Sequence, residues 1–423
     1  GVSSAASDVY KRQWQYGGLV RYDRKSGEAL DIKPQEKEGE AAFRWNWDAP
    51  LIISNFSNTR LYFAANKIFR SDDRGNTWKT ISDDLSRGLD RNKLPVMGKV
   101  WSMDAVAKNS STSIYGNITA LAESPKNESL IYAGTDDGLI QVSDNGGKSW
   151  TKIEKFAGVP DRTLVHNIIG SQHDENMVYA VFNNHRNGDF KPYIMKSSDK
   201  GRTWSSISSN LPERGSVYCI AEDHMNSNLL FAGTEFGIYF SLNGGGNWTA
   251  LNGGLPTTCV RDIAIQKREN DLVIATFGRG FYVLDDYAVL QKIKKEDLEE
   301  KAKIFPVKDA YVFVESTPLG HKGKSNQGES FYTAENPAVG TTFTYWLKED
   351  VKTIKEKRKE AEKDKIKNNL PVYYPSADSI RMEDNEEAAY LMMVISDEAG
   401  NVIRKIKQPA KKGMYRVNWN GRL

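Results

Sequence analysis

Carboxylates in turns and irregular segments are the side chains of this protein best suited to acid–base chemistry. Two carboxylates that face each other across a cleft can hydrolyse a glycosidic bond, at roughly 6.5–9.5 Å in inverting enzymes and about 5 Å in retaining ones. The candidates are Asp48, Asp104, Asp136, Asp137, Asp189 and Glu235. The alternative is that they are ordinary solvated turn carboxylates, so the sequence leaves the catalytic residues unassigned.

Aromatic and basic side chains in the same regions are suited to holding a polar ligand. A tryptophan beside a carboxylate suits stacking on a sugar ring, and Trp47 and Trp101 have Asp48 and Asp104 nearby. Tryptophan also fills space between packed sheets, which is the alternative for both residues. The candidate ligand-binding residues are Trp47, Trp101, His166, His185, Tyr218, Arg261 and Arg279.

A repeated turn motif indicates how these residues are positioned. The pattern Ser-x-Asp-x-Gly-x-Ser/Thr-Trp occurs at residues 71–78, 143–150, 197–204 and 241–248, with Asn145 and Asn243 replacing the Asp in two copies. In such a turn the Asp accepts hydrogen bonds from backbone N–H groups and Gly permits a positive φ. We expect the four tryptophans to be largely buried beside their turns. The turn residues are Ser71, Asp73, Gly75, Trp78, Ser143, Gly147, Trp150, Ser197, Asp199, Gly201, Trp204, Ser241, Gly245 and Trp248.

Apolar positions around the turns repeat with a fixed spacing of eleven residues. The pairs are Leu51 with Tyr62, Leu121 with Tyr132, Ile168 with Tyr179, Ile220 with Phe231, and Ile263 with Ile274. Each repeat is consistent with four short strands, and a period of about 45 residues favours the blades of a β-propeller. Residues 18–32 match the last hairpin of an earlier blade, so we expect five blades and part of a sixth. Propellers often close with seven, and the remaining blades are expected upstream.

Several segments resemble the bacterial sortilin-type proteins with BNR (Asp-box) repeats. They are residues 44–50 (RWNWDAP), 94–98 (LPVMG), 134–141 (GTDDGLIQ) and 277–286 (FGRGFYVLDD). Such proteins are often labelled glycosyl hydrolases, and xyloglucanase-like propellers are a more distant resemblance. The resemblance implies an all-β fold: a β-propeller with four-stranded Asp-box blades, about five and a half of seven present, followed by a truncated Ig-like β-sandwich. The Asp-box is a turn element that performs no chemistry, so this analogy does not settle function.

The predicted site lies on the face opposite the Asp-boxes. Two insertions fall there, residues 83–117 and 183–190, with the turns that carry Asp136, Asp137, Glu235 and Arg279. The starts of the first strands reach the same face, and their equivalent positions hold Ala49, Thr119, His166, Tyr218 and Arg261. Long loops on a regular scaffold often carry function. The alternative is that these are capped strand ends. A sialidase is disfavoured, because only Arg261 occupies a position suited to an arginine cluster.

Metal and disulfide chemistry have little support. His185 and Asp189 offer two potential ligands, fewer than a zinc site needs, so no metal and no cofactor are expected. Cys219 and Cys259 are the only cysteines, so no disulfide framework holds the fold. They lie near the first strands of adjacent repeats, at non-equivalent positions, and a disulfide between them remains an alternative.

The chain is predicted to divide into four parts. Residues 1–13 resemble a sequencing or adapter scar and are excluded from fold reasoning. Residues 14–290 form the incomplete propeller and 291–303 a linker. Residues 304–423 form the sandwich-like domain, with strands at 310–314, 341–347, 389–395 and 415–419 and a charged helical insertion at 351–369.

Composition limits the classes of function. The net charge of +3, from 58 basic and 55 acidic residues, gives no argument for nucleic-acid binding. No apolar run approaches the roughly 20 residues of a membrane span. We expect a secreted, periplasmic or cell-surface protein that binds a peptide or glycan, alongside a missing N-terminal propeller of the same protein. The alternatives are a xyloglucanase-like glycoside hydrolase and a purely structural role.

Overall fold

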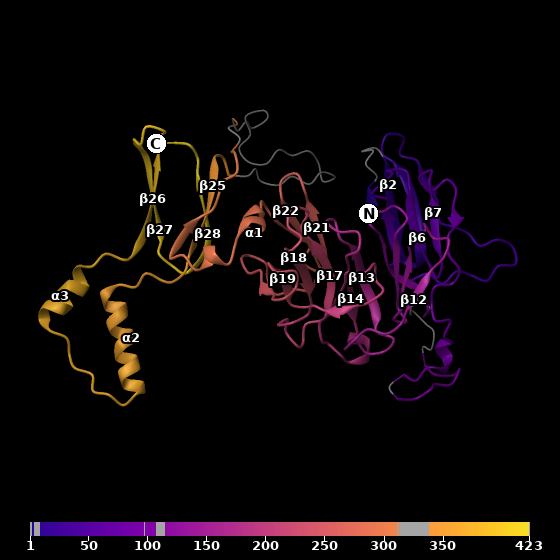
Figure 1. Ribbon diagram of the computed structural model, residues 1–423, viewed down its shortest axis with the longest axis horizontal. Coiled ribbons are helices and arrows are strands. Elements are labelled where there is room, and N and C mark those ends of the chain that lie inside the picture. The colour runs from indigo at the N-terminus through magenta and orange to yellow at the C-terminus, as the bar shows by residue number, and fades with distance from the viewer. Residues whose placement is uncertain are drawn as a thin grey trace. The chain divides into compact units, whose positions relative to one another are not determined.

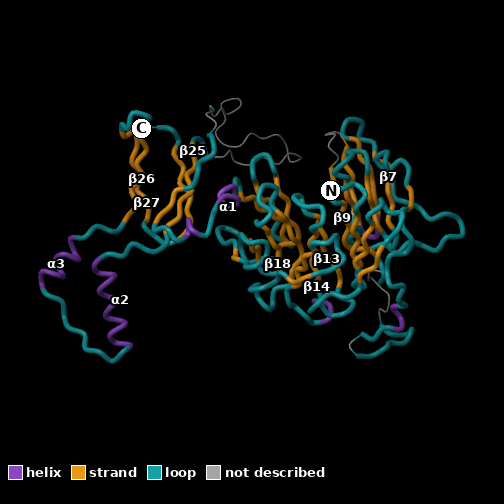
Figure 2. Tube along the Cα trace, in the orientation of Figure 1, coloured by secondary structure: helices purple, strands orange, loops and turns teal. Residues whose placement is uncertain are grey.

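The protein divides into two units, residues 1–291 and residues 292–423. The computed structural model describes residues 2–3, 9–96, 98–106, 115–310, 313 and 338–422, with the backbone alone for 2–3 and 9–13. Strands dominate the first unit, and two longer helices belong to the second (Figure 1, Figure 2). Among the described residues no helix is long and apolar enough to cross a membrane.

The first unit consists of six antiparallel sheets, each built from consecutive strands in meander order, as in a β-propeller. Blade 1 holds β1 (Val2–Ser3), β2 (Val9–Trp14), β3 (Gly18–Asp23) and β4 (Ala29–Asp31); blade 2 holds β5 (Leu51–Ile53), β6 (Leu61–Ala64), β7 (Ile68–Ser71) and β8 (Lys79–Thr80); blade 3 holds β9 (Ile118–Glu123), β10 (Ile131–Thr135), β11 (Ile140–Ser143) and β12 (Thr151–Ile153). Blade 4 holds β13 (Leu164–Gly170), β14 (Val178–Asn183), β15 (Tyr193–Ser197) and β16 (Ser205–Ser206); blade 5 holds β17 (Val217–Glu222), β18 (Leu230–Thr234), β19 (Gly237–Ser241) and β20 (Thr249–Ala250); blade 6 holds β21 (Val260–Gln266), β22 (Asp271–Thr276) and β23 (Phe281–Leu284).

Both ends of this unit differ from expectation. Blade 6 has three strands where the repeat predicts four, and the short helix α1 (Ala288–Lys292) follows β23. At the other end, β2 pairs along its whole length with β3, although residues 9–13 fall in the segment excluded as a scar. Short 3-10 helices cover Gln15–Gly17, Arg91–Lys93, His185–Asn187 and Glu296–Leu298.

The core lies between neighbouring blades. Every residue of β6, β10, β14 and β18 is buried, because these strands are covered on both faces. Strands buried on both faces show continuous apolar runs rather than alternation. Between blades 3 and 4, Tyr132, Val165 and Phe182 form one buried cluster.

The spacing of eleven residues identified the paired strands but not their register. In blade 5 the directly opposed residues are Ala221 with Phe231, so the predicted pair Ile220 and Phe231 is displaced by one. Leu51, Leu121 and Ile168 are displaced from their predicted partners in the same way. Only Ile263 and Ile274 are directly opposed. A shift of one residue places the two side chains on opposite faces of the sheet.

The four box turns, at residues 71–78, 143–150, 197–204 and 241–248, share one hydrogen-bond pattern. In the first, the Ser71 hydroxyl donates to Asp73 (2.8 Å) and accepts from the Gly75 N–H (2.7 Å), and the Thr77 N–H donates to Asp73 (2.9 Å). Asn145 and Asn243 accept the equivalent bonds through their amide oxygens. The turns therefore keep their geometry where the Asp is replaced.

The glycines of the box turns allow each blade to approach the one before it. Gly147 has φ of +90°, and a Cβ there would meet the carbonyl oxygen of Ile81 in blade 2 at 2.8 Å. Gly245 has φ of +91° and would meet Ile207 of blade 4 at the same distance. A side chain at either position would thus be strained and would push two blades apart.

The four box tryptophans are covered to different degrees, in line with the prediction that they are largely buried. Trp248 is buried, but Trp78, Trp150 and Trp204 are only partly buried. The physical reason is that the indoles lie at the outer edge between blades. Trp78, Trp150 and Trp248 donate their indole N–H across that edge, to the carbonyls of Ile32, Ile81 and Ile207 in the preceding blade. Trp204 donates to Gly201 within its own turn.

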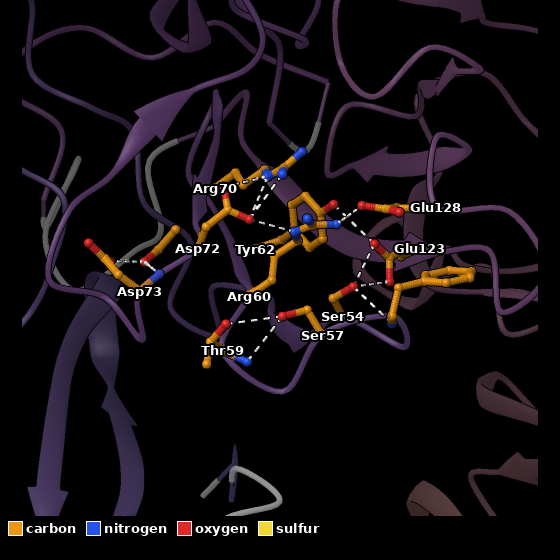
Figure 3. Close-up of polar contacts among 12 residues, drawn as sticks. Ser54, Ser57, Thr59, Arg60, Tyr62, Arg70, Asp72, Asp73, Glu123 and Glu128 are labelled. Carbon is orange, nitrogen blue, oxygen red and sulfur yellow. Dashed lines mark hydrogen bonds and ion pairs between the residues drawn. The ribbon is translucent and has the colours of Figure 1, made fainter.

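Buried glutamates connect neighbouring blades on the box-turn face. Glu123, at the end of β9, accepts bonds from the Ser54 hydroxyl, the Asn55 N–H and the Tyr62 hydroxyl of blade 2 (Figure 3). Glu222, at the end of β17, accepts the equivalent bonds from Ser171, Gln172 and Tyr179 of blade 4. The same type of polar contact therefore joins blade 2 to blade 3 and blade 4 to blade 5.

Among its described residues, the second unit contains two sheets and two longer helices. Strands β24 (Ala302–Ile304), β25 (Thr341–Leu347) and β28 (Gly413–Trp419) form one sheet, and β26 (Tyr390–Ser396) pairs with β27 (Val402–Pro409). Helix α2 (Ile354–Lys367) lies in the charged segment and begins with a capping box of Thr353 and Glu356. Helix α3 (Ala377–Asn385) was not expected; its Glu383 pairs with Arg358 of α2. The strand expected at 310–314 falls mostly outside the described residues.

Candidate functional site

Four consecutive blades carry a β-bulge at the start of their first strand. The ladder between the first and second strands skips one residue in each blade, and these residues are Thr119, His166, Tyr218 and Arg261. A bulge leaves the extra residue unpaired and turns its side chain away from the regular alternation, and bulges are common next to functional sites. Four of the five positions in the variable column predicted at the strand starts are therefore bulge residues, and the fifth, Ala49, precedes β5.

The bulge residues contact one another from blade to blade. The Thr119 hydroxyl donates to the carbonyl of Val165 (2.7 Å), next to His166. Nδ1 of His166 lies 2.8 Å from the carbonyl oxygen of Tyr218. The Arg261 guanidinium lies 4.3 Å from the centre of the Tyr218 ring. The first strands of neighbouring blades also pack on each other, so this row lines the inner side of the unit. We call Thr119, His166, Tyr218, Glu235 and Arg261 the mouth residues.

Glu235 is the one candidate carboxylate that contacts a bulge residue. It lies in the turn between β18 and β19 and accepts a short hydrogen bond from the Tyr218 hydroxyl. Burial and this bond raise the pKa of Tyr218, so the phenol keeps its proton. Arg261 is exposed above the Tyr218 ring. The mouth thus presents an acceptor and a cationic donor beside an aromatic ring.

His166 is a neutral acceptor in this arrangement. Burial, and secondly the charge of Arg261, lower the pKa of His166 to about 4. Its Nδ1 faces a carbonyl oxygen, which can only accept, so the proton of the neutral ring resides on Nδ1. The other ring nitrogen, Nε2, is then left with a lone pair.

His185 and Asp189 both lie in the insertion of blade 4, but their side chains bond to different residues. The ring of His185 contacts the Asn183 amide, and burial, followed by the charges of Arg186 and Arg261, lowers its pKa. Asp189 accepts from the Asn184 amide (2.9 Å) and the Tyr193 hydroxyl (2.6 Å), so it holds its own loop. In the described parts of the chain no three His, Cys, Asp or Glu side chains are grouped to hold a metal.

Among the described residues, Asp136 and Asp137 form their hydrogen bonds with the insertion at 83–117 and with their own turn rather than with a mouth residue. Both are buried. Asp136 accepts from the N–H groups of Gly116 (3.0 Å) and Asn117 (2.9 Å), and Asp137 accepts from the Thr135 hydroxyl and the Arg87 N–H. They therefore anchor both ends of the insertion at 83–117. Burial raises the pKa of Asp136 to about 7 despite these bonds, with a further contribution from Asp137.

The other predicted residues are not joined to the mouth. Trp47 packs edge-on against Tyr16 (5.3 Å), and Asp48 is exposed beside it. Trp101 donates to the carbonyl of Val96 within its own loop, and Asp104 is exposed. Arg279 is exposed in the turn between β22 and β23. Among described residues, no hydrogen bond or ion pair links Asp48, Asp104 or Arg279 to a mouth residue.

Two neighbours of the mouth were not among the predicted site residues. Phe277 is 73% exposed and its ring lies 5.8 Å from the Arg261 guanidinium. Cys259 is half-buried, and burial raises its pKa. Both cysteines are free, which excludes the alternative of a disulfide between Cys219 and Cys259. The sequence signal that could have identified Phe277 was the segment at 277–286, from which only Arg279 was chosen as a ligand-binding candidate.

Comparison with known proteins gives partial similarities. No family model matches the chain. Over 154 residues it is 29% identical to a xyloglucanase of Hypocrea jecorina (strain QM6a), which covers 33% of this chain and 17% of that protein. The chain therefore spans less than a fifth of that relative's length.

Solved structures with a similar course of the chain share little sequence with it. They include an ancestral GH74 enzyme (15% identity, TM-score 0.43, covering 71% of this chain and 36% of that one) and the GH74 xyloglucanase from Xanthomonas campestris (16%, 0.40, 68% and 51%). A third is YCF48 bound to the D1 peptide (13%, 0.40, 68% and 80%).

Proposed function

We propose that this protein binds a glycan at the mouth formed by Thr119, His166, Tyr218, Glu235 and Arg261. The observation that carries the proposal is the row of bulges in four consecutive blades, which sets one side chain of each blade out of the regular alternation of its strand. Four repeats thus have a bulge at the same position, the start of the first strand, and bulges are common next to functional sites.

The chemistry of the mouth suits sugar hydroxyls. Glu235 and the free nitrogen of His166 accept hydrogen bonds, and Arg261 donates them. The exposed ring of Phe277 offers an apolar face to the C–H side of a sugar. A few convergent polar groups beside aromatic surface are typical of ligand sites.

A glycan is preferred over a peptide because of the sequence comparison. The partial identity of 29% is to a protein named for its action on xyloglucan. A peptide remains an outcome of the experiment. We also propose that the protein acts outside the cytoplasm, as expected of a polysaccharide-binding protein of the sortilin-like, Asp-box type.

Titration of the protein with xyloglucan and cello-oligosaccharides by calorimetry tests the proposal. Loss of a hydrogen bond to a charged group costs about 1.5–3 kcal/mol, so Arg261→Ala should weaken binding about tenfold or more. Arg268→Ala is the matched control, since Arg268 is an exposed arginine in the turn that follows the same strand. The proposal fails if neither glycan binds, if Arg261→Ala binds as tightly as the wild type, or if only peptides bind.

Glycoside hydrolysis is a second candidate, favoured by the same partial identity to a xyloglucanase. The mouth offers Glu235 and no second candidate carboxylate in contact with it. The acid–base pair would therefore need a carboxylate from elsewhere, such as another propeller of the same protein. Release of reducing ends from xyloglucan, abolished by Glu235→Gln, would establish this activity; binding without release would reject it.

A further inference from the structure

A groove separate from the mouth runs along the outer strands of blade 2. It encloses about 1220 Å³ and is bordered by residues of the segment after blade 1, by β7 and β8, and by the box turn of blade 3. None of the mouth residues lines it. Its size exceeds what a single small ligand requires, since typical ligand pockets hold about 300–1,000 Å³.

Aromatic rings form the apolar part of the groove. Phe43 and Phe69 are buried in its floor, and Trp78 and Trp150 lie partly exposed along it. Both indole N–H groups are already bonded, to the carbonyls of Ile32 (2.7 Å) and Ile81 (3.2 Å). What the two tryptophans offer a ligand is therefore ring surface rather than a hydrogen bond.

The charged lining is unbalanced in favour of cations. The lining cations are Lys33, Lys37, Lys67, Arg70, Lys79, Lys148 and Lys152, and the lining acids are Glu40, Asp72, Asp83 and Asp84. Two of the acids are already neutralised, because Asp72 pairs with Arg60 and Arg70 and Asp84 pairs with Arg44.

Three exposed lysines of the groove have no such partners. Lys37, Lys79 and Lys148 are exposed, and within the described chain none of them forms an ion pair. Lys152 pairs with Glu154, and Lys67 lies over the Phe43 ring at 5.9 Å. The groove thus combines uncompensated positive charge with two tryptophan rings, which is complementary to an anionic ligand with apolar faces.

We propose that this groove binds an anionic polysaccharide of the uronic-acid class. Sugar rings pack on Trp78 and Trp150, and the carboxylates of successive sugars pair with Lys37, Lys79 and Lys148. An acidic peptide that binds by adding a strand to a free sheet edge fits less well. The edge strand here, β8, is only two residues long (Lys79–Thr80), which leaves few backbone groups for such pairing.

The test compares two oligosaccharides that differ in charge alone. Oligogalacturonate and its fully methyl-esterified form share the same sugar rings, and only the first carries carboxylates. We expect the protein to bind oligogalacturonate, with affinity that falls as salt rises from about 50 to 200 mM because screening weakens exposed charge pairs. The methyl ester should bind at least about tenfold more weakly.

Matched lysine variants locate the site. The triple variant Lys37→Ser, Lys79→Ser, Lys148→Ser should lose about tenfold in affinity, as expected for three exposed charge pairs. The control Lys155→Ser, Lys267→Ser, Lys295→Ser removes the same charge from exposed lysines outside the groove and should bind as the wild type does. Arg261→Ala should leave this binding unchanged, so the groove and the mouth fail or succeed independently.

Three results would overturn the proposal. The first is equal affinity for oligogalacturonate and its methyl ester. The second is equal loss in the groove variant and its control, which would indicate non-specific attraction. The third is binding of poly-glutamate as tight as that of oligogalacturonate, which would show that acidic peptides are the better ligands.

Discussion

Asp73 and Asp199 accept the same backbone N–H bond in their box turns as Asn145 and Asn243 accept in theirs, and each aspartate also accepts a threonine hydroxyl through its second oxygen. The backbone bond of the turn therefore requires an accepting oxygen and not a negative charge. We expect Asp199→Asn to change the free energy of unfolding by less than about 0.5 kcal/mol, and Asp199→Ala to cost about 1–2 kcal/mol because a turn N–H loses its acceptor. Urea denaturation of both variants checks this. Equal losses in both would show that the charge matters.

The buried carboxylate of Asp136 should make stability depend on pH. Its pKa in the folded protein is about 7, above the ordinary 3.8, so the folded state binds more protons than the unfolded state between these values. The favourable contribution of Asp136 is then complete below about 3.8 and is lost as pH rises to about 7. Relative to Asp136→Asn, the wild type should become steadily less stable over that range. A wild-type advantage that stays constant or grows with pH would contradict the buried, anchoring role.

At the residue scale the sequence predicted chemical types better than partners. His166, Tyr218 and Arg261 were identified because equivalent positions varied, and the structure brings them together. The pairing of Tyr218 with Glu235 could not be foreseen, since it depends on where a bulge turns one side chain. Asp136 and Asp137 were assigned to the mouth because they occupy a turn on the same face. Their neighbours in the sequence do not reveal that Arg87 and Gly116 fold back onto them.

At the scale of the blades, a tyrosine of one blade bonds to a glutamate of the next in two blade pairs but not in a third. Tyr62 and Tyr179 donate their hydroxyls to Glu123 and Glu222, but the buried hydroxyl of Tyr132 has no partner among the described residues. The position equivalent to the glutamates is Gly170 in that blade pair, packed against Pro125, which has no N–H to donate. This blade pair therefore has neither the glutamate nor the N–H donor of the other two, although it has the tyrosine.

Tyrosine-to-phenylalanine variants should separate these interfaces. Tyr179→Phe removes a bond to a buried carboxylate and should destabilise the protein by about 1–2 kcal/mol. Tyr132→Phe removes a buried hydroxyl that makes no bond and should be neutral or stabilising. Denaturant unfolding of the two variants makes the comparison. A similar loss in both would mean that Tyr132 has an acceptor after all.

Periodicity in the sequence located the strands of the blades but not their pairing register. Short apolar runs located the second strands of the blades, since strands buried on both faces need them. Their register could not be read from the spacing or from the bulges, because blade 2 is displaced by one residue without a bulge and blade 6 is directly opposed despite one. Blade 6 has no Asp-box motif, and its fourth strand was inferred from the repeat alone.

At the scale of the whole first unit, the two faces of blade 6 differ in the exposure of their described apolar side chains. Its inner face packs on blade 5 through Ile263, Ile274 and Tyr282. On the opposite face Phe281 is 77% exposed and Val283 54% exposed. Exposed apolar surface of this kind favours association with another protein surface.

We expect the protein to self-associate through this face. The double variant Phe281→Ser, Val283→Thr should shift the protein towards monomer in sedimentation velocity runs. Phe236→Ser, which removes an exposed phenylalanine from the turn between β18 and β19, serves as the control and should leave the association unchanged. A wild type that is monomeric at high concentration would show that the face needs no partner.

Hydrogen–deuterium exchange with xyloglucan oligosaccharide bound tests the central claim, that the row of bulges forms the binding site, most directly. The account predicts slower exchange in peptides that cover the starts of β9, β13, β17 and β21, where Thr119, His166, Tyr218 and Arg261 lie. The four box turns should exchange at unchanged rates. Protection confined to the box turns, with none at the strand starts, would contradict it.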